Sequence, residues 1–318
     1  MDNVIEIQNV TKKYGNTIAL DNISITINEG DITGFLGTNG AGKSTLMNII
    51  TGYFYMTEGT VKVYGYDILD HPEQVKKLIG YLPEIPPLYM DMSVAAYLKF
   101  VCKLKSIPKK QISNEIKEKM SIMNISHMKN RLIRNLSKGY KQRVGLAQAM
   151  IGDPKILILD EPTVGLDPME MIEIRKTIKE ISKKSTIILS SHILSEVSAL
   201  CNKIMIMDKG KHVITGTPDE LVNKINNSNK LLIRIKGDSE AASKYISTIE
   251  GISMIEHLGE LEVGTTDLVI HSNIENDIRE SVSFVLAHHN FPLLMMKNYD
   301  VTLEETFIKL TANKRGVS

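Results

Sequence analysis

The stretch Gly37-Thr-Asn-Gly-Ala-Gly-Lys-Ser44 decides the fold of this chain. It matches the pattern G-x-x-x-x-G-K-[ST] and lies between a short apolar strand predicted over 31–36 and a helix predicted from 45 to about 52, the context that this motif requires. The glycines let backbone N–H groups curl around phosphate oxygens, and the helix start adds positive potential. We therefore expect Lys43 to reach the β- and γ-phosphates of a nucleotide and the Ser44 hydroxyl to bind Mg²⁺.

A second motif follows another predicted strand. Residues 156–159 are a continuous run of Ile and Leu, which is typical of a parallel strand buried on both faces, and Asp160 and Glu161 come directly after it. Two acids in this position could simply cap the end of a strand. Beside a phosphate loop, however, the pattern predicts that Asp160 lies next to Mg²⁺ and that Glu161 acts as a general base on the attacking water.

A helical segment separates these two motifs. Residues from about 93 to 149 carry apolar positions at helical spacing, and Leu136-Ser-Lys-Gly-Tyr-Lys-Gln-Arg143 places Ser137 and Gly139 at the start of a helix that runs to about Met150. A hydroxyl and free N–H groups at a helix start can bind phosphate, although spacing alone favours an ordinary N-cap. If the two phosphate sites lie on opposite edges of the chain, a head-to-tail dimer would hold ATP between two copies.

The rest of the chain divides into two domains. The prediction is an α/β P-loop core over 1–225, with a helical subdomain at about 88–150, and a small α+β domain over 230–318 that follows a polar linker at 225–230. Further core strands are predicted over 4–10, 23–27, 60–63, 186–189 and 203–207. The second domain is predicted as strand 231–236, helix 239–249, strands 252–257 and 267–271, helix 275–289 and strand 292–297, a ferredoxin-like βαββαβ order, with a last helix at about 303–312.

Composition excludes several classes of protein. The 318 residues carry a formal net charge of +1, so no global attraction to nucleic acid is implied. The two cysteines, Cys102 and Cys201, stand in no metal-ligand spacing and fit a reducing compartment. The acidic N-terminus does not resemble a secretory signal, and the apolar runs are too short to span a bilayer. Any membrane role is therefore expected to come through a partner.

Taken in order, the motifs resemble the nucleotide-binding domain of ABC ATPases. The resemblance covers about residues 1–225 and rests on 37–45, 136–143, Asp160-Glu-Pro-Thr163, Gly165-Leu-Asp167 and Ser191-His192. It implies ATP and Mg²⁺ as ligands and ATP hydrolysis as the reaction. The expected ATP contacts of the phosphate loop are Gly37, Thr38, Asn39, Gly40, Ala41, Gly42, Lys43, Ser44 and Thr45.

The resemblance also implies roles outside the phosphate loop. Tyr14 matches the aromatic residue that stacks on adenine, and Glu84 stands where a glutamine usually senses Mg²⁺ and the membrane partner. His192 matches a histidine that contacts the γ-phosphate and is a candidate catalytic residue with Lys43 and Glu161. The signature residues that would bind the other subunit's γ-phosphate are Ser137, Gly139 and Lys141, and Asp167 matches an aspartate of the dimer interface. The implied metal ligands are Ser44, Asp160 and Glu84.

Simpler interpretations remain open for three of these residues. Tyr14 alone could be a half-buried loop aromatic, and His192 alone could be a helix-cap residue. Glu84 could be a solvated acid in a proline-rich loop, and a carboxylate there can bind Mg²⁺ but cannot donate an amide hydrogen bond.

Departures from the usual ABC pattern indicate a branch of the family. Thr38 stands where proline is common, the signature reads Ser-Lys-Gly-Tyr-Lys rather than Ser-Gly-Gly-Gln-Gln, and Glu84 replaces glutamine. The signature and the sensor loop resemble bacterial exporters that include drug-resistance and gliding-motility ATPases. The stretch Thr302-Leu-Glu-Glu-Thr-Phe-Ile-Lys-Leu310 resembles the end of the C-terminal appendage of that branch.

We therefore expect an ATP-hydrolysing subunit of an exporter at the cytoplasmic face of a bacterial membrane. Its expected partners are an integral membrane permease and a second copy of itself or a paralogous ATPase, with no nucleic acid. A soluble ABC ATPase acting on ribosomes or DNA is the main rival, but such proteins usually carry two ATPase domains or long coiled coils. A P-loop kinase would have no use for the signature at 137–139.

Two further segments invite interpretation. The apolar residues Leu88, Tyr89 and Met90 follow the sensor loop and could receive a short permease helix, or could pack inside their own domain. Residues beyond about 230 hold no nucleotide-binding position, so we expect them to support dimerisation or regulation. The alternative is that they only stabilise the fold.

Overall fold

The computed structural model describes residues 3–225, 229–260, 262–273 and 277–299. By the density of internal contacts the chain divides into two units, Met1–Pro218 and Asp219–Ser318. This division groups helix α8 (Pro218–Ile225) with the second unit. The expected boundaries at 225 and 230 stay a prediction.

A six-stranded sheet forms the centre of the first unit. Its order is β10-β9-β3-β8-β7-β6, and every neighbouring pair is parallel except β10 with β9. All four residues of β7 and all six of β8 are buried, which confirms the prediction of strands covered on both faces. The strands are β3 (Ile32–Leu36), β6 (Ile79–Leu82), β7 (Ile156–Leu159), β8 (Thr186–Ser191), β9 (Lys203–Asp208) and β10 (Lys211–Gly216).

A second, antiparallel sheet has the order β2-β1-β4-β5. Its strands are β1 (Asn3–Tyr14), β2 (Thr17–Asn28), β4 (Glu58–Val63) and β5 (Tyr66–Asp67). The β1–β2 hairpin extends well beyond the predicted 4–10 and 23–27, because its pairing continues through polar residues as far as Tyr14↔Thr17. Backbone hydrogen bonds, rather than burial, carry it that far.

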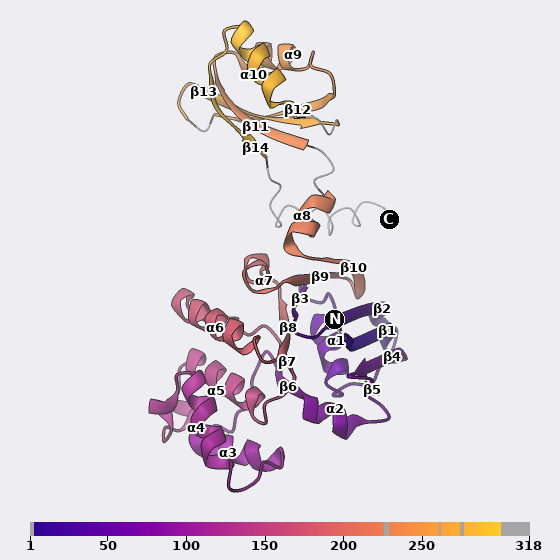
Figure 1. The fold of residues 1–318 in the computed structure, drawn as a ribbon, viewed down its shortest axis with the longest axis vertical. Coiled ribbons are helices and arrows are strands. Elements are labelled where there is room, and N and C mark those ends of the chain that lie inside the picture. Colours follow the sequence, from indigo (N-terminus) through magenta and orange to yellow (C-terminus); the bar gives the residue numbers. More distant parts are fainter. Residues whose placement is uncertain (1–2, 226–228, 261, 274–276, 300–318) are drawn as a thin grey trace. The chain divides into compact units, whose positions relative to one another are not determined.

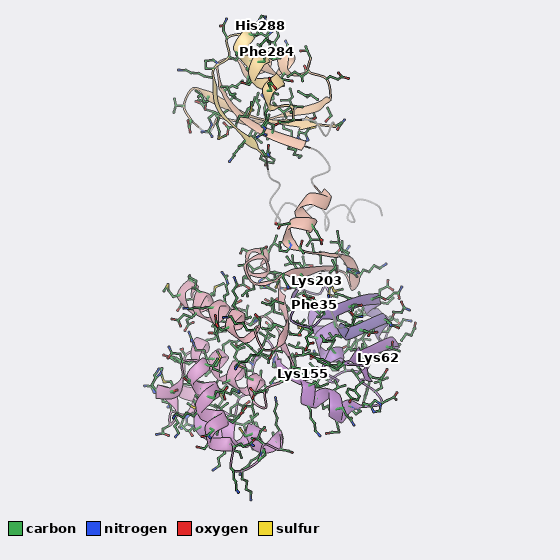
Figure 2. All side chains as sticks on the ribbon, in the orientation of Figure 1. Phe35, Lys62, Lys155, Lys203, Phe284 and His288 are labelled. Atoms are coloured by element: carbon green, nitrogen blue, oxygen red, sulfur yellow. The ribbon has the colours of Figure 1, made fainter. Side chains whose placement is uncertain are left out.

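Helix α1 (Lys43–Ile50) lies between the two sheets (Figure 1). One core cluster joins Leu46 and Ile49 of α1 with Ile7 of β1 and with Phe35 of β3, which lies inside the unit (Figure 2). The phosphate loop that precedes α1 is thereby anchored by a largely buried helix.

The predicted helical subdomain is present on one side of the six-stranded sheet (Figure 1). It contains α3 (Val94–Leu104), α4 (Ile112–Ile122) and α5 (Lys138–Met150), with two short 3-10 turns, Ser126–Met128 and Ile133–Asn135, between α4 and α5. Three helices that the sequence analysis did not single out complete the unit: α2 (Pro72–Leu78), α6 (Pro168–Ile181) and α7 (Leu194–Leu200).

The second unit has the predicted βαββαβ order. Its sheet is antiparallel with the order β12-β13-β11-β14, and α9 and α10 cover one face of it through a core that includes Ile233, Ile246, Ile270 and Leu286. Its elements are β11 (Asn229–Lys236), α9 (Ser239–Ile246), β12 (Ile252–Gly259), β13 (Thr265–Ser272), α10 (Arg279–His288) and β14 (Leu293–Asn298).

Two predictions concern the segments that flank the second unit. The predicted polar linker at 225–230 is wrong at both ends, because α8 runs to Ile225 and Asn229 already pairs with Ser272 as the first residue of β11. The predicted helix at 303–312, and with it the stretch Thr302–Leu310, lies outside the described residues.

Candidate active site

The phosphate loop is closed around the Lys43 ammonium. Lys43 Nζ donates to the carbonyl oxygens of Gly37 at 2.8 Å and of Thr38 at 3.3 Å, and the side chain is buried. Gly42, with φ of 100°, ends the loop, and a Cβ there would lie 2.8 Å from the carbonyl oxygen of Ala19. Only glycine fits this backbone and this close approach. Burial lowers the pKa of Lys43, against the opposing charges of Glu161 and Asp160.

Asp160 lies at the carboxyl end of β7, beside the start of α1. Its Oδ1 accepts hydrogen bonds from Ser44 Oγ at 3.2 Å and from Ser190 Oγ at 2.5 Å, and the side chain is buried. Its backbone N–H donates to the Leu82 carbonyl on β6 at 2.8 Å. The predicted pair of Ser44 and Asp160 therefore comes together. Hydroxyl and carboxylate oxygens are donors that suit Mg²⁺, which usually takes few protein ligands.

Glu161 is held in an uncommon backbone conformation with φ of 46°. Its N–H donates to Ser190 Oγ at 2.9 Å, so Ser190 ties the two acids to the end of β8. Its Oε1 lies 3.8 Å from Lys43 Nζ, and its Oε2 lies 3.0 Å from His192 Nδ1. A strained residue at a convergence of charged groups points to function. One carboxylate thus contacts a lysine on one side and a histidine on the other.

A cavity of about 590 Å³ opens over these groups. It brings together Glu84, Glu161 and His192 with the phosphate loop, as the sequence analysis expected of one site. The cavity is lined by Thr17, Ile18, Ala19, Asn39, Gly40, Ala41, Gly42, Lys43, Ser44, Thr45, Glu84, Glu161, Val164 and His192.

Tyr14 is not among the residues that line this cavity. The residue is 44% exposed, and its ring packs edge-on against Phe54 at 6.2 Å between centroids and lies 4.8 Å from Lys12 Nζ. The β2 residues that follow it, Thr17 and Ile18, reach the cavity instead. The role of Tyr14 in stacking on adenine stays a prediction.

The signature residues lie away from this cavity, at the start of α5. Ser137 caps the helix by accepting the Tyr140 N–H at 3.3 Å, and Asp167 caps α6 by accepting the Glu170 N–H at 2.8 Å. Neither these residues nor Gly139 and Lys141 line the cavity. Within one chain, the described residues therefore form two separate clusters.

Sequence reasoning missed Ser190 and the β2 residues. Ser190 precedes the predicted Ser191-His192 pair, but only the pairing of β7 with β8 shows that its hydroxyl meets Asp160 and Glu161. The β2 residues Thr17 to Ala19 carry no chemical group that a motif would reveal.

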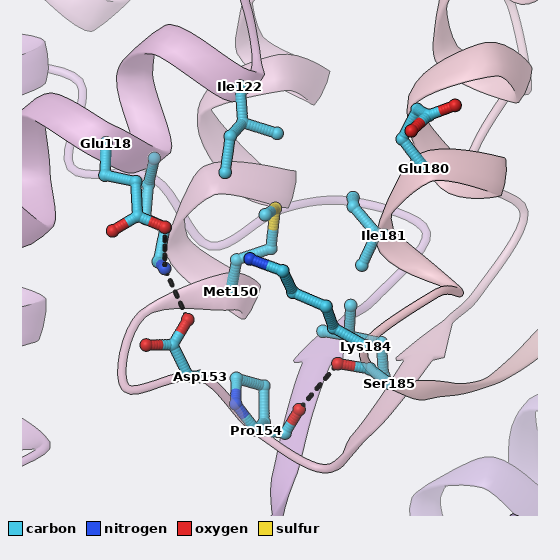
Figure 3. Close-up of a pocket in the computed structure, with 11 residues that line it drawn as sticks. Glu118, Ile122, Met150, Asp153, Pro154, Glu180, Ile181, Lys184 and Ser185 are labelled. Atoms are coloured by element: carbon cyan, nitrogen blue, oxygen red, sulfur yellow. Dashed lines mark hydrogen bonds and ion pairs between the residues drawn. The ribbon is translucent and has the colours of Figure 1, made fainter. Parts of the chain in front are cut away.

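A second cavity of about 530 Å³ lies between α4, the end of α5 and the end of α6 (Figure 3). Its wall includes Lys119, which is 1% exposed and contacts Asp153 at 2.5 Å and Glu118 at 3.2 Å. Apolar side chains, among them Ile122, Met150 and Ile181, also line it (Figure 3). None of the predicted site residues lines it, and we assign it no ligand.

Two kinds of feature are absent from the described part of the chain. It contains no group of three or more His, Cys, Asp or Glu residues arranged to hold a metal ion. None of its helices is both long enough and apolar enough to cross a membrane.

Comparison with known proteins gives consistent matches. A family model described as ABC transporter matches residues 20–164. The bacitracin transport ATP-binding protein BcrA of Bacillus licheniformis is 32% identical over 82% of this chain and 87% of its own length. The linearmycin resistance ATP-binding protein LnrL of Bacillus subtilis is 28% identical over 97% of this chain and 98% of its own length. The structure of cbiO1 from Clostridium perfringens, part of the transporter complex cbiONQ, is 30% identical with a TM-score of 0.64, covering 71% of this chain and 95% of that one.

Proposed function

We infer that the residues around the phosphate loop hydrolyse ATP, because this chain belongs to the ABC transporter family of ATP-binding proteins. It is an ATP-binding and ATP-hydrolysing subunit of a transporter. The observation that carries the assignment of the site is Glu161, whose carboxylate oxygens lie 3.8 Å from Lys43 Nζ and 3.0 Å from His192 Nδ1 at the mouth of the phosphate loop.

The phosphate loop would hold the triphosphate of ATP. Backbone N–H groups from Gly40 to Thr45 and the start of α1 suit the phosphate oxygens, and Lys43 would neutralise charge on the β- and γ-phosphates. Tyr14 is proposed to stack on adenine, with Thr17 and Ile18 beside the nucleotide.

Ser44 and Asp160 would hold Mg²⁺, with Glu84 as a further candidate ligand. The support is the 3.2 Å contact between Ser44 Oγ and Asp160 Oδ1, two oxygens of the kind that Mg²⁺ prefers. When bound, the ion neutralises charge that develops on the phosphates. Ser190 keeps the Asp160 carboxylate in place through its own hydrogen bond.

Glu161 would accept the proton of the attacking water. His192 holds one of its oxygens at 3.0 Å and so fixes the direction of the other. The γ-phosphate would lie between His192 and Lys43, so that the water is directed in line with the bond to be broken. The products are ADP and inorganic phosphate.

The signature would complete the site in a dimer. Ser137, Gly139 and Lys141 lie at a helix start away from the cavity of their own chain, so we propose that they bind the γ-phosphate held by the other copy. Asp167 would lie at the same interface. The other copy is the same chain or a paralogous ATPase.

Substitution of Glu161 by glutamine tests the assignment. The variant should still bind ATP, because the amide keeps the shape of the site, but kcat should fall by about 10²–10⁴-fold as the general base is lost. ATPase assays, nucleotide-binding titrations and sizing chromatography with ATP measure this, and the variant should collect as an ATP-bound dimer. Glu180→Gln, on the exposed part of α6, serves as the control. Hydrolysis near the wild-type rate would refute the role of Glu161.

We propose that the transporter is an exporter. The support is the resemblance of the signature and sensor loop to bacterial exporters, together with relatives named for bacitracin transport and linearmycin resistance. An integral membrane permease would carry the cargo path and hold this chain at the cytoplasmic face of the membrane. A solved relative that belongs to a multi-subunit transporter complex supports this arrangement.

The permease contact is proposed near the sensor loop, with one correction. Leu88 is buried at 8% exposure and packs within its own unit, so it is not available to a partner. Ile85, Tyr89 and Met90 are exposed and form the remaining candidate surface. The second unit, which holds none of the proposed nucleotide contacts, is proposed to support dimerisation or regulation.

A further inference from the structure

The start of α5 packs directly against the loop that follows Glu161. The buried Gln142 Nε2 donates to the Pro162 carbonyl oxygen at 3.0 Å. Two more contacts join the start of α5 to this loop and to the first turn of α6, and in each of them a charged side chain fills the space above a glycine.

The first of these contacts is Lys138 on Gly165. A Cβ built on Gly165 would lie only 2.0 Å from Lys138 Nζ, and the φ of Gly165 is 67°. The ammonium group thus occupies the space that any side chain at 165 would need. In the second contact the glycine is on α5 and the charged side chain comes from α6: a Cβ on Gly139 would lie 2.1 Å from Glu170 Oε1. Residues 138 and 139 therefore interlock with 165 and 170.

The segment that Lys138 touches is the turn that carries Glu161. Within the turn, Val164 N–H donates to the Glu161 carbonyl and Leu166 N–H to the Thr163 carbonyl, both at 3.2 Å, the upper end of the usual range for such bonds. Glu161 itself has φ of 46°, an uncommon conformation that surrounding contacts must maintain. Lys138 contacts this turn from outside.

We propose that Lys138 is a positioning residue that acts within its own chain. By holding Gly165 against the start of α5, it fixes the turn from Glu161 to Leu166 and so keeps the Glu161 carboxylate directed between Lys43 and His192. The catalytic consequence rests on the proposed function of Glu161, whereas the contact with the turn does not. This lysine stands where the ABC signature commonly has glycine, and that substitution gives the chain a contact that glycine cannot make.

Hydrogen exchange on the full-length chain without nucleotide tests the contact. In Lys138→Gly, the amides of 163–166 should exchange about two- to fivefold faster, the size expected for one partly exposed contact, while β7 and β8 keep their protection. Lys138→Arg, which retains the charge and length, should stay near the wild type. Lys176→Met, an exposed lysine on α6, is the control and should change nothing.

ATPase kinetics then separate this role from a direct phosphate contact. A positioning role predicts that Lys138→Gly lowers kcat about threefold or more while KM for ATP changes little, because the affected group is Glu161. Unchanged exchange in the nucleotide-free chain, with a raised KM and normal kcat, would overturn the proposal and make Lys138 a phosphate ligand of the other copy. If the wild type had no ATPase activity, the proposed function would fail, and the exchange result would still decide whether Lys138 holds the turn.

Discussion

At the scale of single residues, the proposed chemistry depends on the contact between Glu161 and His192. The two side chains meet at 3.0 Å, and both line the phosphate-loop cavity. If His192 only contacted the γ-phosphate, its contribution to the rate would not depend on Glu161. If His192 also directs the Glu161 carboxylate, its contribution to the rate depends on that carboxylate. The geometry favours the second case.

This pair predicts strongly non-additive losses. His192→Ala should lower kcat by about 10²-fold or more, and His192→Ala combined with Glu161→Gln should be scarcely slower than Glu161→Gln alone, because groups that act as a unit do not lose activity independently. Steady-state ATPase rates of the two single variants and the double variant, with His212→Ala as the remote histidine control, measure the coupling. Two losses that multiply would show that His192 and Glu161 act separately.

The positions of site residues were predictable where a motif determines both the type of side chain and the backbone conformation around it. Lys43 and Ser44 follow a strand and begin a helix, so their placement depends on neighbours in the sequence. Exposure of Tyr14 and Leu88 was not predictable, because it depends on Phe54 and on packing of the helical subdomain, which no local pattern specifies. Ser190 reaches the two acids only through strand pairing.

At the scale of elements, a lysine joins the ends of two helices. Lys105 follows α3, and its Nζ donates to the carbonyl oxygens of Ile151 at 2.7 Å and Ala149 at 3.4 Å, at the carboxyl end of α5. A cation there binds free carbonyl groups and interacts favourably with the helix dipole. Burial nevertheless lowers the pKa of Lys105 to about 8, with the charge of Glu115 acting in the opposite direction.

The lowered pKa predicts a pH dependence of folding. Between pH 8 and 10.5 the unfolded chain keeps this proton while the folded chain loses it, so the free energy of unfolding should rise with pH, by at most about 1.4 kcal/mol per pH unit. Below pH 8 both states are protonated, and the full cost of the buried charge is present. The difference in free energy of unfolding between the wild type and Lys105→Met should therefore shift in favour of the wild type from pH 8 to 10. The same difference between the wild type and Lys103→Met, the control, should not change. Parallel curves for Lys105→Met would mean that the ammonium is not desolvated.

Helices and strands were predicted correctly where the apolar residues form a clear pattern in the sequence, either an uninterrupted run or a regular alternation. The Ile and Leu runs of β7 and β8 are strands, and the order of the second unit follows from its alternating apolar segments. Helix α6 went unremarked because its buried positions, Ile174, Ile178 and Ile181, stand among charged residues. The early start of β11 reflects pairing with β13 rather than any apolar signal at 229.

At the scale of the whole molecule, each protomer carries two separate clusters of residues that we propose as the two halves of a phosphate site. The cavity holds Lys43 and Glu161, while Ser137 and Gly139 begin α5 outside it. In a symmetric dimer every contact from one copy to the other occurs twice, so two composite sites would form, each with a phosphate loop from one chain and a signature from the other. The interlock of Lys138 with Gly165 would then connect the signature of one site to the base of the other.

A mixed dimer tests this arrangement. Lys43→Ala removes the phosphate contact of the loop, and Ser137→Arg places a bulky side chain where the other copy's ATP would bind, so each variant alone should be inactive. In a mixed dimer both lesions fall in one composite site and leave the other intact. Equal amounts of the two variants should therefore recover about a quarter of the wild-type rate, because half of the dimers are mixed and each has one intact site of two. ATPase assays on the mixture measure this, with two differently tagged Lys43→Ala chains as the control that recovers nothing. Full activity in a strictly monomeric wild type, or no recovery together with no ATP-dependent dimer of Glu161→Gln, would contradict the shared site.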